Sequence, residues 1–440
     1  MSFEEFILAH EGDDVGALAL ARDRYASSVE DFDLALNTLA ARRKLRDKVP
    51  EWYAVPALVY PLRLSAEQCS STSTALYKAC VALTATDDTK SGQNVQSAYL
   101  EVLRMHKMGP NRAIADLTGG LGVDSWAFSK RFGQVLYNEM RPELAKAAEH
   151  NFRLLGAANI VVRNAALGPL SGALSRTAPT AHQSVREILG DFCPDMIYLD
   201  PARRAQDGRK VFRLEDCRPD VLTLLPELLY ACPRLLLKLS PMADISLVCS
   251  QLGCVREVHV VAAGGECKEL LLLLEKGHEG PYRLFVVEDG AVQEIPGQAG
   301  EDASFANDGL SGSERPSARF LFEPGKALLK AGAFDWPCRF GLRKLGRHTH
   351  LYIGPEPVEE LAPFGKWFRI VEILPLNKRS LRELASRYPQ ADVTARNIPL
   401  TSEELRARLR VRPGSGIHIF GLHEDACAAA VLYVCARQAW

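Results

Sequence analysis

The segment IADLTGGLGVDSW, residues 114–126, constrains the fold more strongly than any other part of the 440-residue chain. An apolar run ends at Asp116, and three glycines follow within four positions, at Gly119, Gly120 and Gly122. Glycine leaves the backbone bare, so a ligand can approach it closely, and free N–H groups at the start of a helix favour an anion. The pattern therefore predicts a strand, a ligand-binding loop and a helix in that order.

Residues 96–277 alternate short apolar strands with helical stretches, which is typical of an α/β domain. The last interval, AGGECK at residues 263–268, is hairpin-like. We therefore expect a sheet that is parallel except for an antiparallel final strand. The seven expected strands are residues 112–116, 134–139, 160–164, 196–200, 235–240, 255–262 and 269–275.

The sequence pattern differs on the two sides of this domain. Residues 1–95 are expected to be helical, because SVEDFDLALNTLAARRKLRDKV spaces its apolar residues as a helix does. After Gly277, two strands around an Asp-Gly turn precede residues 296–319, whose composition marks a loop. The final hundred residues mix several strands with a helix signal at KRSLRELASRY.

Details of the glycine loop distinguish between its possible ligands. A dinucleotide-binding loop has the pattern G-x-G-x-x-G, but Ser125 stands where the third glycine belongs, and the lysine of a phosphate-binding P-loop is absent. Glu139 ends the second expected strand, where an acid can accept hydrogen bonds from both hydroxyls of a ribose. The combination favours a nucleoside ligand such as adenosylmethionine.

On these residues the chain resembles the class I S-adenosyl-L-methionine-dependent methyltransferases. The resemblance covers residues 96–277 and implies a Rossmann-like domain with strand order 3-2-1-4-5-7-6. It implies that the glycine loop and Glu139 hold the cofactor, that Asn164 meets the adenine, and that Asp200 and Pro201 form the end of the catalytic-motif strand. The implied cofactor-binding residues are Asp116, Thr118, Gly119, Gly120, Gly122, Glu139, Asn164 and Asp200.

The segment LDPARR, residues 199–204, is expected to receive the methyl acceptor. In enzymes that methylate exocyclic amines the corresponding motif is (D/N)-P-P-(Y/F/W), whose acid and proline carbonyl accept hydrogen bonds from the amine. Asp200 and Pro201 can do this, whereas Ala202 and Arg203 replace the second proline and the aromatic residue. Arg203 can stack on a base or hold a phosphate, although a solvated charged loop is the alternative for this stretch.

Lys238 interrupts the apolar fifth strand in LLLKLSPMAD. Side chains at this end of an open α/β sheet point into the site, so Lys238 either takes part in catalysis or extends to solvent. Glu266 and Glu269 lie near the same edge, and a solvated hairpin is their expected environment. The expected catalytic residues are Asp200, Pro201, Arg203 and Lys238.

The segments DLTGGLGVDS, LDPARR, GECKELL and VTARNIPLTSEELRARL together resemble a bacterial family with an N-terminal helical region and a C-terminal THUMP-like domain. THUMP domains are RNA-binding modules in tRNA-modifying enzymes, and the first segment is also similar to that of a ribosomal RNA guanine-N2 methyltransferase. The expected domains are a helical region at 1–95, a methyltransferase domain at 96–277, a ferredoxin-like subdomain at 278–335 and a THUMP-like α+β domain at 336–440.

Composition limits the other classes of function. No apolar run reaches the roughly 18 residues of a membrane span, and MSFEEFILAHEGDD lacks a signal segment, so no membrane association and a cytoplasmic location are expected. The 11 cysteines form no C-x-x-C, and the ten histidines, of which His348 and His350 are the closest pair, have no metal-binding spacing. We therefore expect neither a disulfide framework nor a metal.

The net charge of −1 conceals a basic C-terminal part, because residues 337–440 hold 16 Lys and Arg against 10 Asp and Glu. Together with the resemblance, this predicts methyl transfer from S-adenosyl-L-methionine to structured RNA, a tRNA or an rRNA, at a base nitrogen. A small-molecule or protein methyltransferase would carry the same cofactor loop, and a non-catalytic RNA-binding module would carry the same basic domain. Both alternatives stay open at this point.

Overall fold

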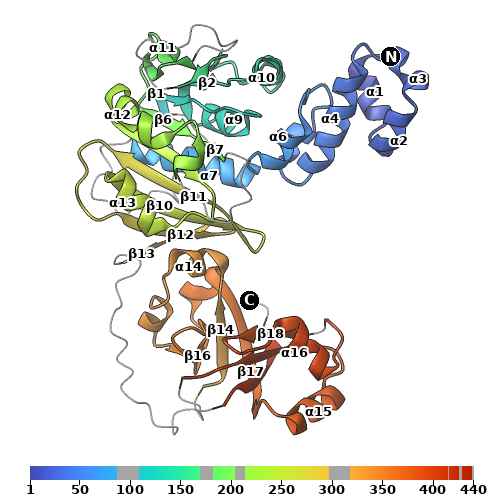
Figure 1. The fold of residues 1–440 in the computed structure, drawn as a ribbon, viewed down its shortest axis with the longest axis vertical. Coiled ribbons are helices and arrows are strands. Elements are labelled where there is room, and N and C mark those ends of the chain that lie inside the picture. Colours follow the sequence, from blue (N-terminus) through green and yellow to red (C-terminus); the bar gives the residue numbers. More distant parts are fainter. Residues whose placement is uncertain are drawn as a thin grey trace. The chain divides into compact units, whose positions relative to one another are not determined.

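The computed structural model describes residues 1–86, 109–168, 182–203, 214–296, 318–414, 416–425 and 429–438. These residues form two compact units (Figure 1). Unit 1 comprises Met1–His259 and Glu269–Tyr282, and unit 2 comprises Val260–Lys268 and Arg283–Trp440.

Unit 1 begins with a series of helices, as the sequence predicts. Several start at a side-chain cap: Ser2 forms a capping box with Glu5, and Asp14, Asp31 and Ser71 each accept a backbone N–H of the first turn. The helices are α1 (Phe3–Ala9), α2 (Val15–Leu20), α3 (Arg22–Tyr25), η1 (Ala26–Ser28), α4 (Phe32–Leu45), α5 (Pro50–Tyr53), α6 (Arg63–Gln68) and α7 (Thr72–Ala85).

Among the described residues, one sheet has nine strands, and seven of them have the order β10-β11-β9-β6-β1-β2-β3. Numbered along the chain as seven main strands, this is 3-2-1-4-5-7-6 read from the β3 edge, which confirms the expected order. β1 pairs in parallel with β2 and β6, and β11 is antiparallel to β9, as predicted. The strands are β1 (Gly109–Asp116), β2 (Phe132–Asn138), β3 (Ile160–Arg163), β6 (Met196–Leu199), β9 (Arg234–Leu239), β10 (Val255–Ala263) and β11 (Glu266–Glu275).

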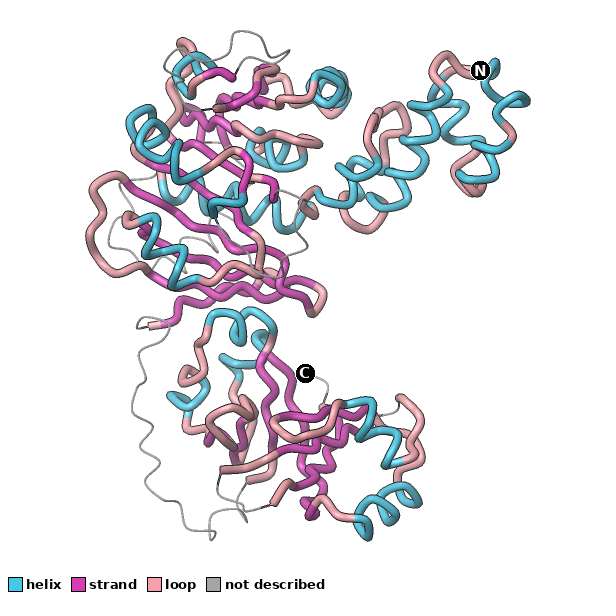
Figure 2. Tube along the Cα trace, viewed as in Figure 1, coloured by secondary structure: helices cyan, strands magenta, loops and turns pink. Residues whose placement is uncertain are grey.

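Helices follow the strands of this sheet and pack beside them, as the cyan tubes next to the magenta strands show (Figure 2). Pro142 lies at the start of α10, where its missing N–H costs nothing. Gly253 ends α13 with a left-handed φ of +73°. The remaining elements of unit 1 are α9 (Val123–Ser129), α10 (Pro142–Leu154), β4 (Ala166–Leu167), β5 (His182–Gln183), α11 (Val185–Leu189), β7 (Ala202–Arg203), η3 (Leu214–Asp216), β8 (Cys217–Arg218), α12 (Val221–Ala231) and α13 (Ile245–Leu252).

The N-terminal helices are joined to the sheet by buried contacts within unit 1. Trp52 is fully buried and meets Trp126 of α9 edge-to-face at 6.2 Å between ring centroids. The side-chain amide of Asn151 in α10 both donates to and accepts from the backbone of Val59, at 2.9 Å in each case. The helical region therefore packs directly against the helix that follows the glycine loop.

Unit 2 contains a hairpin and a second sheet. The hairpin joins β12 (Arg283–Glu288) to β13 (Ala291–Ile295) through Asp289 and Gly290, which both have positive φ, as the Asp-Gly turn predicts. The seven-stranded sheet has the order β15-β16-β14-β17-β20-β19-β18. Its elements are β14 (Phe320–Pro324), α14 (Lys326–Ala331), η5 (Pro337–Phe340), β15 (Arg343–Lys344), β16 (Tyr352–Gly354), η6 (Glu359–Phe364), β17 (Gly365–Pro375), α15 (Lys378–Arg387), β18 (Asp392–Arg396), α16 (Ser402–Leu409), β19 (Ile417–Leu422) and β20 (Val431–Arg437).

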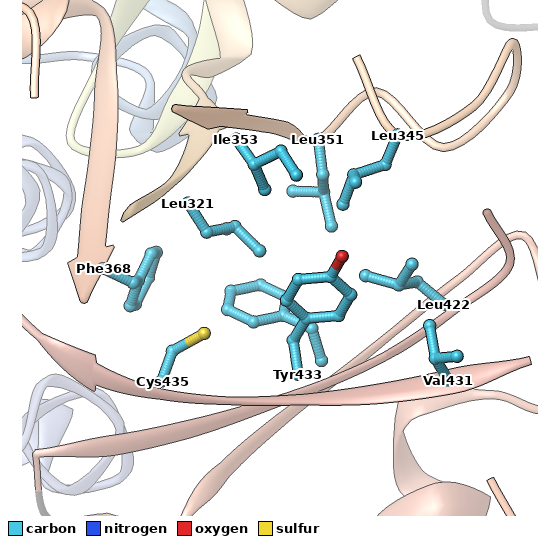
Figure 3. Packing of buried hydrophobic residues seen from close by; sticks show 10 residues of the cluster. Leu321, Leu345, Leu351, Ile353, Phe368, Leu422, Val431, Tyr433 and Cys435 are labelled. Carbon is cyan, nitrogen blue, oxygen red and sulfur yellow. The ribbon is translucent and has the colours of Figure 1, made fainter. Parts of the chain in front are cut away.

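One core of unit 2 lies on the sheet between β14, β16, β17, β19 and β20, where aliphatic side chains surround Tyr433 (Figure 3). A second cluster packs Leu384 of α15 and Leu405 of α16 against the strands. The two helices therefore bury their leucines on the sheet, which leaves their charged faces to solvent.

Candidate active site

Two of the glycines in the loop after β1 are required by their neighbours. A Cβ atom at Gly119 would lie 2.1 Å from the ring of Tyr137, so the tyrosine can pack here only against a glycine. Gly122 has a φ of +94°, and its Cβ would lie 2.7 Å from the ring of Phe152. Aromatic packing and left-handed backbone therefore explain these two positions.

Gly120 differs from them because its surroundings are open. Its φ is +54°, and among the described residues the nearest atom to its Cβ position is the carbonyl oxygen of Thr118, at 3.9 Å. Its N–H donates to Glu139 Oε2 at 2.9 Å, and its carbonyl accepts from the Tyr137 hydroxyl at 2.6 Å. This peptide is thus held in place, yet it leaves room where a side chain would stand, which suits the close approach of a ligand.

Asp116, at the end of β1, is buried and internally hydrogen bonded. It is 1% exposed, and its carboxylate accepts the Ser125 hydroxyl at 2.6 Å and the Thr118 N–H at 3.1 Å. Burial raises the pKa of Asp116 to about 8, although these hydrogen bonds act in the opposite direction. The serine that departs from the dinucleotide pattern therefore serves to hold Asp116, and Asp116 shapes the loop from inside.

Glu139 follows β2 directly and is hydrogen bonded to two other predicted cofactor residues, Gly120 and Asn164. Besides Gly120, it accepts the Arg141 N–H on Oε1 at 2.9 Å, and the Asn164 side chain donates to its carbonyl at 2.6 Å. A carboxylate oxygen has two lone pairs, so each oxygen retains one acceptor position after these contacts with described residues. Gly120, Glu139 and Asn164 are thus brought together in one hydrogen-bonded chain.

Asn138 is a structural residue that sequence reasoning missed. Its side-chain nitrogen donates to the carbonyls of Leu117 and Ala165 at 3.2 and 3.1 Å, and its Oδ1 accepts the Ala165 N–H. Its own carbonyl accepts the Gly119 N–H at 2.7 Å. This side chain ties the ends of β1, β2 and β3 together, and its position directly before Glu139 is the one signal in the sequence that could have drawn attention to it.

Asp200 lies directly after β6, beside the glycine loop. Its N–H donates to the hydroxyl of Thr118 at 2.7 Å. Its Oδ2 accepts from Lys238 Nζ at 2.5 Å. Two of the residues predicted as catalytic are therefore in contact, and one of them is hydrogen bonded to the predicted cofactor loop.

Lys238 is held as a cation inside unit 1. Its side chain is 12% exposed. Burial alone would lower the pKa of Lys238, but the carboxylates of Asp200, Glu269 and Asp124 raise it above the usual range. At neutral pH this lysine is a charged hydrogen-bond donor, and it does not extend to solvent.

Glu269 corrects an expectation from the sequence. Glu266 is solvent-exposed, as predicted for the hairpin, and pairs with Lys268. Glu269 is 3% exposed, and both of its carboxylate oxygens accept from Lys78 Nζ, at 3.0 and 2.9 Å. β11 enters the interior at this residue, and its cationic partner lies 191 positions earlier in the chain, which no local pattern indicates.

Lys78 and Asp124 complete this buried cluster and were also missed. Lys78 Nζ lies 3.2 Å from Asp124 Oδ1 and donates to the Ser70 hydroxyl at 2.8 Å. Asp124 Oδ2 accepts from Ser70 and from the Tyr198 hydroxyl, at 3.0 and 2.9 Å. A lysine in a helix otherwise rich in small and apolar residues was the available signal for Lys78.

The rest of the DPARR segment is described only in part. Pro201 is buried, and exposed Ala202 pairs with Arg218 through the short ladder between β7 and β8. The backbone of Arg203 belongs to the same ladder. The side chain of Arg203 and residues 204–213 lie outside the described residues, so the predicted contact of Arg203 with an acceptor stays a prediction.

The basic segment of unit 2 exposes its arginines and buries its leucines. On α16, Leu405 and Leu409 are buried, whereas Arg408 is exposed and Arg410, at the left-handed C-terminal cap, is exposed as well. On α15, Lys378, Arg379 and Arg382 are exposed around buried Leu384, and Arg387 pairs with Glu372 and Glu383. These side chains can reach a polyanion without disturbing the core.

The described ranges contain neither a metal-ligand cluster nor a membrane-spanning helix. Among these residues, no group of three or more His, Cys, Asp and Glu side chains is placed to hold a metal ion. In the same part of the chain, no helix combines the length and apolar character that crossing a membrane requires.

A solved structure matches this chain over most of its length. A protein of Porphyromonas gingivalis W83, whose crystal structure is described as that of a candidate methyltransferase, is 29% identical to this chain; the match covers 92% of this chain and 90% of that one, with a TM-score of 0.71. This chain has a methyltransferase fold. A ferredoxin-like domain model matches residues 320–361, and a THUMP domain-like model matches residues 365–437.

Other methyltransferase structures are more distant. An rRNA methylase of Streptococcus thermophilus is 12% identical, covers 39% of this chain and 90% of its own, and has a TM-score of 0.25. The M. jannaschii tRNA m1G37 methyltransferase is 12% identical, with coverage of 38% and 44% and a TM-score of 0.23. No curated protein matches the sequence. The methyltransferase fold with ferredoxin-like and THUMP-like domains therefore rests on the first neighbour and the two domain models.

Proposed function

We propose that this chain is an S-adenosyl-L-methionine-dependent methyltransferase that acts on structured RNA, a tRNA or an rRNA, at a base nitrogen. The observation that carries the proposal is the hydrogen bond from the Asp200 N–H to Thr118, which sets the acid of the acceptor segment beside the glycine loop. The methyltransferase fold and the THUMP-like domain support the same assignment.

The loop residues fit S-adenosyl-L-methionine. Gly120 offers a fixed peptide with open space at its Cβ position, and Glu139 retains one acceptor position on each carboxylate oxygen for the two hydroxyls of a ribose. Asn164 is bonded to the Glu139 carbonyl and would meet the adenine. The bound cofactor would supply an electrophilic methyl group on a sulfonium.

Asp200 and Lys238 would act on the acceptor. The carboxylate of Asp200 accepts a hydrogen bond from an amine or ring N–H and so orients the nitrogen, and the Pro201 carbonyl can accept a second one. Lys238 cannot serve as the base, because it is already protonated at neutral pH. Its ammonium donates to Asp200 and so fixes the orientation of this carboxylate.

The RNA would be held by the basic face of α15 and α16 in the THUMP-like domain. A phosphate backbone is bound by arginines that are exposed, as Arg408 and Arg410 are. A cytoplasmic location agrees with such a substrate and stays part of the proposal. A small-molecule or protein substrate would leave this basic face without a role.

Nucleoside mass spectrometry tests the function directly. RNA from cells that lack the protein should be short of one methylated nucleoside, and expression of the wild-type chain should restore it. Expression of Asp200→Ala should not, because turnover is expected to fall about 100-fold when a positioning or proton-accepting group is lost. Identical nucleoside profiles in tRNA and rRNA with and without the protein would rule out the RNA substrate.

A further inference from the structure

Five charged side chains form a continuous line from the interior of unit 1 to the acceptor segment. Lys78 Nζ lies 3.2 Å from Asp124 and 2.9 Å from Glu269 Oε2. Glu269 Oε2 in turn lies 3.9 Å from Lys238 Nζ, which donates to Asp200 at 2.5 Å. One carboxylate, that of Glu269, is therefore shared by two ammonium groups.

From Lys78 outward, the exposure of the side chains rises along the line, whereas Asp124, on the other side of Lys78, is 11% exposed. The exposure is 0% for Lys78, 3% for Glu269, 12% for Lys238 and 36% for Asp200. Only the last member is accessible enough to meet an acceptor. The inner members can act on the reaction only through Lys238.

The register of the sheet explains why Glu269 reaches Lys238. β11 is antiparallel to β9, and Leu271 lies opposite Lys238. Side chains two positions apart on a strand share a face, so Glu269 lies on the face of Lys238 as its diagonal neighbour. Lys78 approaches the same carboxylate from α7, in the N-terminal helical region.

We propose that Glu269 and Lys78 are positioning residues: Glu269 holds the Lys238 ammonium in line with Asp200, and Lys78 holds Glu269. The inference rests on the proposed methyl-transfer function. Because Lys78 belongs to α7, the inference gives this N-terminal helix a part in the acceptor site. Removing the Glu269 carboxylate would leave Lys238 buried with Asp200 as its close partner. The Lys238 side chain should then gain motion and lose its proton more readily.

Glu269→Gln is the main test, and Glu266→Gln is its matched control, since the same change is made on the same strand at an exposed position. The first readout is the mobility of Lys238 at pH 7, from relaxation of lysine labelled with ¹³C at Cε, with the resonance assigned by its absence in Lys238→Met. Glu269→Gln should make this side chain markedly more mobile, and Glu266→Gln should not. This measurement needs neither cofactor nor acceptor, so it stands even if the proposed function fails.

The second readout is methyl transfer to total tRNA or rRNA as a function of pH. In Glu269→Gln, kcat at pH 7 should fall about 10-fold with little change in KM for RNA. The alkaline decline of activity should also begin at a pH at least about 1 unit lower in Glu269→Gln than in the wild type. Burial still lowers the pKa of Lys238 in this variant, and Asp200 and Asp124 are the carboxylates left to raise it. Asp116, Tyr198, Lys78 and Cys69 also face this cluster and are present in both proteins.

A triple variant separates positioning from stability. Lys78→Met/Asp124→Asn/Glu269→Gln removes Lys78 together with both of its carboxylate partners and should recover most of the stability that a single change costs. If these three residues only support the fold, this variant should also recover wild-type kcat; positioning predicts that kcat stays low and Lys238 stays mobile. Wild-type mobility of Lys238 and wild-type pH dependence in Glu269→Gln would overturn the inference.

Discussion

At the scale of single residues, the three acids of the site, Asp116, Glu139 and Asp200, have different environments. Asp116 is buried and its bonds are internal, so it acts on the shape of the loop. Glu139 binds the loop backbone and still has acceptor positions for a ligand. Asp200 is the most exposed of the three and accepts a hydrogen bond from Lys238. Their different burial therefore indicates different roles for residues of the same chemistry.

Replacing Glu139 by alanine should weaken the binding of adenosylmethionine and adenosylhomocysteine to the same extent. The ribose hydroxyls would lose a charged acceptor, which is worth roughly 1.5–3 kcal/mol, and neither contact involves the transferred methyl group. Calorimetry of the full chain measures both affinities. Glu143→Ala, at an exposed position on α10, is the control and should bind as the wild type does. Equal affinities in all three proteins would remove Glu139 from the cofactor site.

Asp116 should make the stability of the fold depend on pH. Its pKa is raised from 3.8 to about 8, so the unfolded chain releases this proton at a lower pH than the folded chain does. The contribution to stability is complete below about pH 4 and is lost as pH rises to about 8. Asp116→Asn does not titrate: it should be destabilised by about 1–2 kcal/mol at pH 5, for a lost hydrogen bond, and less or not at all at pH 8.

Urea unfolding at pH 5, 6.5 and 8 would measure this change. Asp191→Asn, at an exposed position, controls for the loss of a carboxylate. If Asp116→Asn lost the same amount of unfolding free energy relative to the wild type at all three pH values, the raised pKa of Asp116 would be contradicted.

At the scale of elements, helices α15 and α16 combine two functions on opposite faces. Their leucines fill the second core of unit 2, and their basic residues remain in water. A charge change on the outer face should therefore alter binding with little effect on folding.

Arg408→Glu/Arg410→Glu should weaken the binding of tRNA or rRNA without changing cofactor affinity. The reversal replaces two attractive phosphate contacts by repulsion, so a loss of at least about 10-fold is expected at low salt. Gel-shift titration measures it. Lys44→Glu/Arg46→Glu, at exposed positions in the N-terminal helical region, makes the same change in net charge. Equal weakening by both pairs would show a general charge effect and no specific role for α16.

At the scale of the whole molecule, the near-neutral net charge combines an acidic first part with a basic last hundred residues. Long-range attraction to RNA is therefore weak overall, and affinity must come from the basic face. The two ligands of the proposed enzyme should respond differently to salt.

RNA affinity should fall steeply with salt in the full-length protein, whereas adenosylhomocysteine affinity should stay nearly constant. Each phosphate contact releases condensed counterions, and the slope of log Kd against log salt counts them. Titrations between about 50 and 200 mM salt would measure this slope for RNA and for adenosylhomocysteine. For RNA, the slope of Arg408→Glu/Arg410→Glu should be shallower than that of the wild type. A flat RNA profile would contradict binding through the basic face.

Sequence alone determined the strands of unit 1, the glycine loop and the acids at the ends of the first, second and fourth of these strands, because strand ends, turns and glycine positions are set by local backbone chemistry. The order of the strands in the sheet was implied by the resemblance to the class I methyltransferases. The sequence also indicated the hairpin at Asp289 and Gly290. Tertiary structure decided the environment of Glu269, which the sequence placed in solvent and the fold buries between Lys78 and Lys238. The partner Lys78 comes from an element 191 positions away in the chain. The burial and pairing of a charged side chain depend on which distant residues the fold packs around it, and a local sequence pattern does not contain this information.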